Sequence, residues 1–426
     1  MKKTNQSANR RLTIMTIDQV ISGASNVLMA VLAAHVLGVA SFGLFGIVFL
    51  VYTIAAGVSR ALVSEPLLVH PIEAEDRPGE VIGSALLISL GLAAIVLLAG
   101  VGVAFFNHSL GYALVVLAVC LPLLVLQDLG RYQAFAIQKP GRAIVLDLAW
   151  LVLLFGGIAA IFATHERTLV WFIAVWAGSG AAAGLLLAFQ YRALELHITL
   201  RWLGFTWGFS WRYLVSYSSI QGAALVGSVA VGGIAGARAL GAVQGTLLLQ
   251  RPFTTFVSAA GAAGIGDMRR SRTGHEIRRH ISRLAALSSG AALLNAIVLM
   301  ILPTRLGQLV LGGTWHAAKP LLLPTAVSLV CLGVTTAARS GLLGMRRPTP
   351  AVVIDVASTI AALVATVLGA AVDGARGAVW GVAVVRILAL VPWWSECLTN
   401  ARRAEPAGIS PAAVPEPAGS VAAGVG

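Results

Sequence analysis

Long apolar segments follow one another along almost the whole chain, and they restrict its fold more than any other feature. Twelve segments each approach the ~20 residues that a helix needs to cross the hydrocarbon core of a bilayer. They lie near residues 12–37, 42–63, 81–105, 111–137, 143–163, 168–190, 213–235, 241–265, 284–303, 319–343, 351–372 and 378–398. Only 11% of the residues are charged, against about 25% in soluble domains. Because lipid cannot satisfy backbone polar groups, the pattern predicts an all-α polytopic membrane protein with twelve transmembrane helices.

The basic residues lie mostly in alternate loops. With the N-terminus in the cytoplasm, 20 Lys and Arg residues fall in cytoplasmic segments and 5 in external loops. This bias predicts cytoplasmic N- and C-termini. The net charge of +13 therefore encodes topology, and no basic patch stands apart from the span ends as a nucleic-acid site would. The arginine-rich loop at 266–283 is interpreted as a positive-inside anchor or, alternatively, as a contact with anionic lipid head groups.

One segment of the chain recurs 208 residues later. The shared pattern is arginine, basic residue, proline and aspartate at equal spacing, and its copies lie at 131–147 and 339–355. Each copy joins one apolar segment to the next. A weaker echo relates the glycine turns at 38–43 and 236–241, which join spans 1 and 2 and spans 7 and 8. Two repeats of six spans share one orientation, an organisation common in transporters.

We therefore expect two six-helix lobes, an N-lobe at 12–190 and a C-lobe at 213–398. Three cytoplasmic segments complete the predicted organisation. These are an N-terminal tail at 1–11, a linker between the lobes at 191–212, and a disordered tail at 399–426 that is rich in Pro, Ala and Gly.

Several charged side chains fall inside the predicted spans, where a charge costs at least ~2.5–3.5 kcal/mol at the bilayer centre. In the repeated segment, Arg131 and Arg339 lie near the cytoplasmic end of one span, and Asp147 and Asp355 lie near the cytoplasmic start of the next. We expect each arginine to pair with the aspartate of its own copy, as a structural or gating salt bridge repeated in both halves. Asp128 shares a helical face with Arg131, so these two side chains can neutralise each other.

Two further arginines lie deeper. Arg251 is near the middle of its span and is followed by Pro252, which lacks a backbone donor and frees carbonyls at the same depth. Arg386 is about eight residues inside the last span, roughly 12 Å deep at 1.5 Å per residue. We interpret both as substrate-facing. The shallower Arg60 is interpreted either as a snorkelling anchor or as a third cationic contact.

The polar residues of span 1 recur at helical spacing and are Asp18, Gln19, Ser22, Ser25 and Asn26. Desolvation moves an aspartate pKa towards physiological pH, so Asp18 and Asn26 mark a candidate coupling site. A polar helix-packing face explains the same residues equally well. The sequence contains no phosphate-binding Gly-Lys motif, zinc-ligand spacing or nucleophile elbow. It therefore predicts no catalytic residue, metal site or cofactor.

Several segments resemble a known transporter family. They are the opening at 18–26, the turn at 37–43, the run from Arg60 to Pro66, the linker at 139–142 and Pro252. In these segments the chain resembles actinobacterial Wzx-like oligosaccharide flippases of the multidrug/oligosaccharidyl-lipid/polysaccharide (MOP) superfamily, and the resemblance extends to near Asn400. It implies a MOP/MATE-like architecture, with two six-helix lobes forming a V around a central cavity. It also implies movement of undecaprenyl-diphosphate-linked glycans from the inner to the outer leaflet.

The charged residues agree with such a substrate, because a diphosphate needs cationic hosts and arginine offers a bidentate fork. We therefore expect an inner-membrane flippase rather than an enzyme, in which Arg251 and Arg386 hold the diphosphate and Arg60 assists its entry from the cytoplasmic side. Its expected substrate is a lipid-linked oligosaccharide. Its expected partners are membrane lipids and glycan polymerases or glycosyltransferases.

Two alternative functions remain. The first is a cation-coupled multidrug exporter of the same superfamily, with Asp18 as its coupling residue. The second is a membrane enzyme of glycan assembly, against which the very short external loops and their few acidic residues count.

Overall fold

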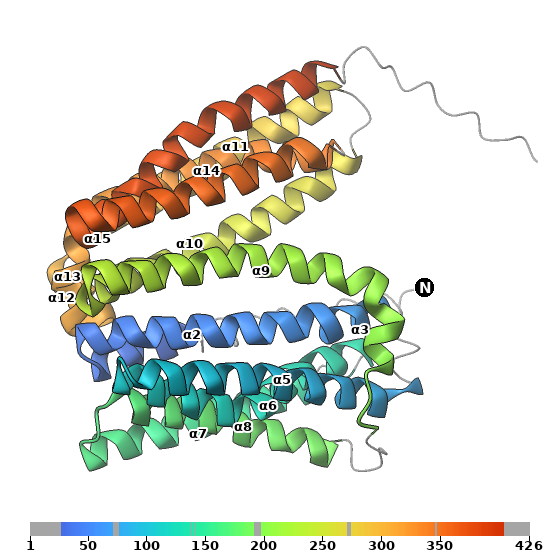
Figure 1. Ribbon diagram of the computed structural model, residues 1–426. Helices are drawn as coiled ribbons and strands as arrows, with labels where there is room; N and C mark the ends of the chain where they lie inside the picture. The colour runs from blue at the N-terminus through green and yellow to red at the C-terminus, as the bar shows by residue number, and fades with distance from the viewer. Residues whose placement is uncertain are drawn as a thin grey trace, which may run out of the picture. The chain divides into compact units, whose positions relative to one another are not determined.

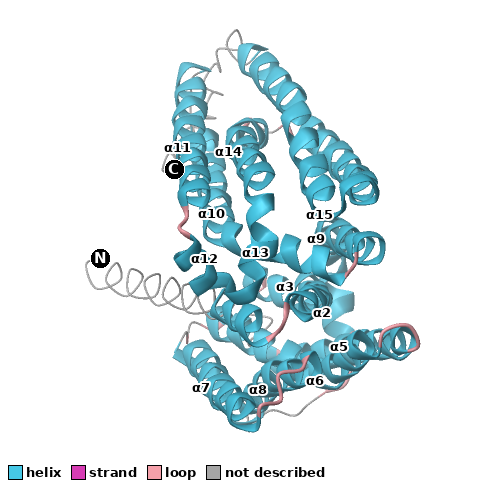
Figure 2. Ribbon diagram, turned by 90° about the vertical axis from the view of Figure 1, so that its left-hand side faces the viewer, coloured by secondary structure: helices cyan, strands magenta, loops and turns pink. Residues whose placement is uncertain are grey.

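The computed structural model describes residues 27–70, 76–137, 139, 141–190, 197–270, 274–345 and 347–403. These residues form helices joined by turns, and no strand occurs among them (Figures 1 and 2). Eight of the described helices are long and apolar enough to cross a membrane. The all-α polytopic membrane fold predicted from the apolar segments is therefore confirmed.

The helical segments follow the predicted spans. In chain order they are Val27–Val36, α2 (Val39–Ser59), η1 (Arg60–Ser64), α3 (Glu65–Val69), α5 (Pro78–Ala104), α6 (His108–Ala136), α7 (Gly141–Thr164), α8 (Leu169–Gln190), α9 (Arg201–Ala235), α10 (Ala237–Arg270), α11 (Gly274–Ile301), α12 (Thr304–Leu311), η2 (Gly312–Thr314), α13 (Trp315–Ala318), η3 (Lys319–Leu321), α14 (Leu322–Gly344) and α15 (Pro348–Arg403).

Several boundaries differ from the predicted ones. Helix α11 begins inside the predicted arginine-rich loop at 266–283, and α12, η2 and α13 lie before the predicted start of the next span. Helix α9 begins at Arg201, inside the predicted linker, and α15 continues to Arg403, inside the predicted tail. The N-terminal tail and the remainder of the C-terminal tail lie outside the described residues. Helix α15 contains the last two predicted spans as two arms that meet at Asp373 and Gly374. Gly374 has a φ of +54°, which glycine adopts without the steric cost of a Cβ atom.

The described residues pack as two compact units. Unit 1 comprises those within Met1–Leu249, Leu302–Leu323 and Leu363–Gly381, and unit 2 comprises those within Gln250–Ile301, Pro324–Ala362 and Val382–Gly426. The lobe boundaries at 12–190 and 213–398 stay a prediction.

Aromatic side chains of α2 and α8 form the centre of unit 1. The Trp176 ring, which is buried, lies edge-on to Tyr52 at 5.1 Å and to Phe45 at 6.3 Å between centroids. Phe172 meets Phe45 edge-on at 5.5 Å. The α2 rings are seven residues apart and so share one helical face, which is the buried one. Edge-to-face pairs of this kind contribute about 0.5–1.5 kcal/mol beyond the area that they bury.

The two glycine turns of the weaker echo meet inside unit 1. A Cβ atom on Gly43 of α2 would lie 2.6 Å from the backbone nitrogen of Gly241 on α10, and one on Gly241 would overlap the carbonyl oxygen of Val39. Small residues at both positions let the two backbones approach this closely. Gly43 and Gly241 occupy matching positions in the two glycine turns, and they contact each other. Matching residues meet in this way when two repeats are related by a pseudo-twofold axis.

Unit 2 has its own small core. It joins Ile281 of α11 and Leu342 of α14 to Trp393 and Cys397 of α15. Gly341 of α14 allows this approach, since a Cβ atom there would lie 2.9 Å from the Cys397 sulfur.

Candidate functional site

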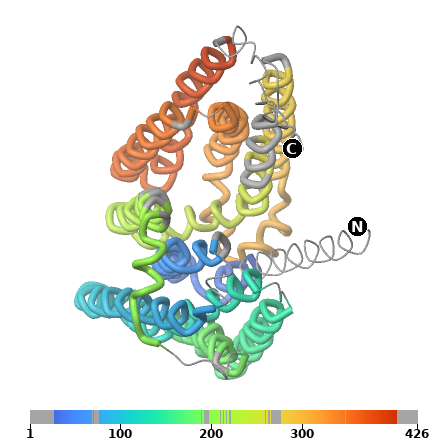
Figure 3. The backbone as a smooth tube through the Cα atoms, turned by 90° about the vertical axis from the view of Figure 1, so that its right-hand side faces the viewer, coloured from blue at the N-terminus to red at the C-terminus, as the bar shows by residue number. Residues whose placement is uncertain are grey.

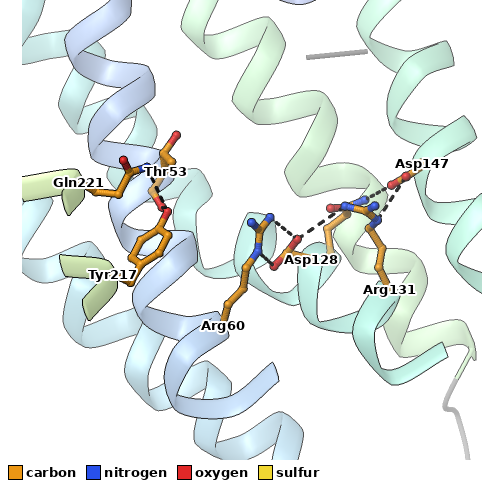
Figure 4. A network of polar contacts seen from close by, with 8 residues as sticks. Thr53, Arg60, Asp128, Arg131, Asp147, Tyr217 and Gln221 are labelled. Carbon is orange, nitrogen blue, oxygen red and sulfur yellow. Dashed lines mark hydrogen bonds and ion pairs between the residues drawn. The ribbon is translucent and has the colours of Figure 1, made fainter. Parts of the chain in front are cut away.

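Unit 1 contains a row of alternating charges carried by η1, α6 and α7 (Figure 4). Arg60 donates from Nε to Oδ2 of Asp128 at 2.6 Å and from Nη2 to Oδ1 at 2.7 Å. Arg131 lies farther along the row, with Nε 3.2 Å from Oδ2 of Asp147 and Nη1 3.8 Å from Oδ1 of Asp128. The row thus alternates cation and anion and is neutral as a whole.

The sequence of α6 assembles the middle of this row. Asp128 and Arg131 are three residues apart and project from one helical face. The preceding Gln127 donates from Nε2 to Oδ1 of Asp147 at 3.0 Å. The side chains of Arg131, Asp128 and Asp147 are 10%, 5% and 7% exposed. Charges that are this buried are tolerated when they are paired and hydrogen-bonded.

Arg60 is the accessible member of the row. Its side chain is 34% exposed, and its Cζ atom lies 5.9 Å from the centroid of the Tyr132 ring. A guanidinium at this distance is attracted to the face of an aromatic ring. Arg60 is therefore bound through its Nε edge and partly covered by Tyr132.

The backbone of Arg60 begins a π-helical turn, Arg60–Ser64. Its sequence cause is Pro66, which has no N–H and whose ring clashes with the carbonyl four residues earlier, that of Leu62. Ser210 Oγ of α9 donates to this carbonyl at 3.4 Å, and Trp202 Nε1 donates to the carbonyl of Val63 at 3.4 Å. Single π-turns inside helices are frequent at functional sites. This one sets the position from which the Arg60 side chain extends.

Helix α9 runs beside α2 (Figure 3), and a hydrogen bond joins the two helices about two turns before Arg60 (Figure 4). The Tyr217 hydroxyl donates to the carbonyl of Thr53 at 2.8 Å and accepts from Gln221 Nε2 at 3.4 Å. Gly57 leaves the space that the Tyr217 ring occupies, because a Cβ atom there would overlap the ring. Polar side chains of α9 thus donate to backbone carbonyls of α2 and of the π-helical turn that follows it.

Unit 2 contains the two deep arginines. Arg386, on the second arm of α15, is half-buried and donates from Nη1 to the carbonyl oxygen of Ser328 on α14 at 3.2 Å. No carboxylate in the described part of the chain pairs with it. A carbonyl offers only a partial negative charge, so Arg386 remains a net cation within its apolar helix.

Arg251 is half-buried on α10, immediately before the intrahelical Pro252. Its backbone carbonyl accepts from the Oγ1 atoms of Thr254 and Thr255, each at 3.0 Å. Hydroxyl groups therefore supplement the backbone bonding next to the proline.

The second copy of the repeated segment also forms an ion pair. Arg339 Nε lies 2.9 Å from Oδ2 of Asp355, and these side chains are 47% and 41% exposed. The arginine and aspartate of each copy thus lie together in both units, buried in unit 1 and accessible in unit 2. Any gating role for the pairs stays a prediction.

Sequence reasoning missed the partner of Asp128. Its principal cation is Arg60, which is 68 residues away, whereas Arg131 on its own helix lies at 3.8 Å because it turns towards Asp147. Asp18 and Asn26 lie outside the described residues. Within the described ranges, no three His, Cys, Asp or Glu side chains gather as metal ligands would.

Neither a protein-family model nor a curated protein sequence matches the chain. Several solved structures share its fold. An inward-facing multidrug resistance MATE family transporter of the MOP superfamily aligns with a TM-score of 0.71 and 15% identity, over 92% of this chain and 98% of the transporter. Lipid II flippase MurJ, in an inward closed conformation, aligns with a TM-score of 0.67 and 9% identity, over 92% of this chain and 90% of MurJ.

A MOP superfamily transporter from Pyrococcus furiosus aligns with a TM-score of 0.58 and 15% identity, over 93% of this chain and 95% of the transporter. At these identities the likeness establishes the fold. The chain is a multi-pass membrane protein with the fold of MOP superfamily transporters.

Proposed function

We propose that the chain is a flippase of the bacterial inner membrane that translocates a polyprenyl-diphosphate-linked oligosaccharide for cell-surface polysaccharide biosynthesis. The observation that carries this proposal is the positive charge of Arg386, which no carboxylate in the described ranges compensates. This residue lies in an apolar helix and donates to the backbone carbonyl of Ser328 on a neighbouring helix. A guanidinium at this depth requires an anion or water. A diphosphate supplies the anion, and the planar fork of arginine matches its oxygen atoms.

The carboxylates at membrane depth support an anionic cargo. Asp128, Asp147 and Asp355 each have an arginine nitrogen within 3.2 Å. An exporter of organic cations needs acidic groups whose charge is available to the cargo, and these three are already neutralised. The membrane potential also favours the outward transfer of two negative charges, by about 4–5 kcal/mol per 100 mV.

In this proposal, Arg386 and Arg251 bind the diphosphate, the glycan crosses through a hydrated path, and the lipid tail stays in the bilayer. Arg60 assists at the cytoplasmic end, the predicted lobes alternate in access, and both termini are cytoplasmic. The shared fold with a lipid II flippase supports this assignment.

The test is translocation by purified protein in proteoliposomes that contain a fluorescent polyprenyl-diphosphate-linked oligosaccharide. Arg386→Ala and Arg251→Ala should each lower the initial rate about tenfold or more, because each removes a charge-assisted contact worth about 1.5–3 kcal/mol. Arg402→Ala is the matched control, since this exposed arginine lies in the last turn of the helix that carries Arg386. Wild-type rates in both deep-arginine variants would remove their assigned roles.

The alternative function is a cation-coupled multidrug exporter, which the shared fold with a MATE transporter favours. Its coupling residue would be Asp18. Resistance to cationic drugs that the wild type confers and Asp18→Asn abolishes would support this alternative.

A further inference from the structure

We propose that Asp128 is a positioning residue, which holds Arg60 so that the outer edge of the guanidinium can bind a phosphate group. The outer edge consists of Nη1 and the second N–H of Nη2. The phosphate can come from two sources. One is the diphosphate of the cargo, and for this source the inference rests on the proposed function. The other source is a phospholipid head group, which has the same chemistry.

The geometry of the pair leaves the outer edge available. Asp128 binds the Nε side of Arg60 through two short hydrogen bonds, of 2.6 and 2.7 Å. A guanidinium has five N–H donors, so three remain. In the described residues Nη1 makes no hydrogen bond, and the side chain is 34% exposed. The Asp128 side chain is only 5% exposed, so it is too buried to contact a large ligand directly.

Asp128 is bound more closely by Arg60 than by Arg131. Arg131 lies 3.8 Å from Asp128 but 3.2 Å from Asp147, and Gln127 fixes the other oxygen of Asp147. Arg131 thus lies nearer to Asp147, and Arg60 donates a hydrogen bond to each oxygen atom of Asp128. A carboxylate bound to one edge of a guanidinium fixes its orientation. In many binding sites, residues that do not touch the ligand hold the contacting side chains in place in this way.

The backbone and the ring plane of Arg60 are restrained as well. The π-turn that begins at Arg60 is held by Ser210 and Trp202 of α9, and the Tyr132 ring covers the guanidinium from one side. Arg60 therefore has little rotamer freedom left to lose when an anion binds. Pre-organisation of this kind raises affinity.

Binding is measured by isothermal titration of the purified full chain with farnesyl diphosphate, in the Arg251→Ala/Arg386→Ala background so that the deep arginines do not contribute. We expect Asp128→Asn to weaken binding at least about tenfold, because a charge-assisted bidentate contact is lost. Asp128→Glu keeps the carboxylate and should bind within about threefold of the background protein. Arg60→Lys cannot form the bidentate fork and should bind as weakly as Asp128→Asn. Asp76→Asn, an exposed aspartate of the same unit, is the control and should bind as its background does.

Two outcomes would overturn the positioning role. Tighter binding in Asp128→Asn would mean that Asp128 competes with phosphate for Arg60. Unchanged affinity with a lower unfolding temperature would mean that the pair is only structural.

Two measurements distinguish the two sources of the phosphate group. For a lipid-linked cargo, Asp128→Asn should raise the translocation KM about tenfold and leave kcat within twofold. For a head group, KM should not change, but native mass spectrometry should show fewer phosphatidylglycerol molecules retained by Asp128→Asn than by Asp76→Asn. Either loss supports phosphate binding at Arg60, and no change in both measurements contradicts it. If the wild type fails to translocate yet its farnesyl diphosphate binding depends on Asp128, the proposed function fails and this inference stands.

Discussion

Replacement of Gly241 by alanine should destabilise unit 1, because α2 and α10 approach each other there through backbone atoms. The added methyl group would overlap the carbonyl oxygen of Val39 and lie 2.9 Å from its carbonyl carbon. Backbone atoms cannot rotate away, so one helix must shift. Overpacking of this kind costs about 1–3 kcal/mol, and the better helix propensity of alanine returns up to about 1 kcal/mol. The net expectation is a loss of about 1–2 kcal/mol.

The matched control is Gly233→Ala on α9, where an added Cβ atom meets nothing within 4 Å. This change should be neutral or should stabilise the protein by about 0.5–1 kcal/mol. Both variants are unfolded at equilibrium in mixed micelles of increasing dodecyl sulfate content, with tryptophan fluorescence as the readout. If Gly241→Ala unfolds with or after the wild type, while Gly233→Ala behaves as expected, the close crossing of the two repeats is wrong.

Three further predictions use the same unfolding assay. Asp147→Ala should cost about 3–5 kcal/mol, because it strands a buried arginine, whereas Asp355→Ala should cost at most about 1 kcal/mol at its exposed pair; similar losses would contradict the difference in burial. Ser210→Ala should lower the free energy of unfolding by about 0.5–1.5 kcal/mol in the wild type. It should have no effect in a Pro66→Ala background, where the restored amide can donate to the Leu62 carbonyl. Additive losses would argue against proline as the cause of the π-turn. Tyr217→Phe should cost about 0.5–1.5 kcal/mol, and an unchanged stability would show that its hydroxyl bond to α2 contributes nothing.

The helical membrane fold could be predicted from the sequence because lipid leaves the backbone few ways to satisfy its polar groups. The proximity of Arg131 to Asp147, and of Arg339 to Asp355, could also be anticipated. In each copy a short connection joins a helix that carries the arginine near its end to a helix that carries the aspartate near its start. Consecutive helices joined in this way lie side by side, so the spacing alone brings the charges together.

The remainder of the site depends on packing between distant segments. No spacing rule links Arg60 to Asp128, since their contact requires η1 to lie against α6. The π-turn was missed because Pro66 lies near the end of a predicted span, where a proline usually marks a helix end. The repeated motif also gave no indication that one ion pair would be buried and its counterpart exposed, because burial depends on neighbouring helices that the motif does not contain.

The most direct test offers two cargoes to the same proteoliposomes, under an inside-negative potential set with potassium and valinomycin. One cargo is a fluorescent polyprenyl-diphosphate-linked oligosaccharide, and the other is a fluorescent organic cation. We expect the wild type to move the lipid-linked sugar and not the cation, and Arg386→Ala to lose that transport while Arg402→Ala keeps it. Proton-driven transport of the cation that persists in Arg386→Ala, with no movement of the lipid-linked sugar, would contradict the account.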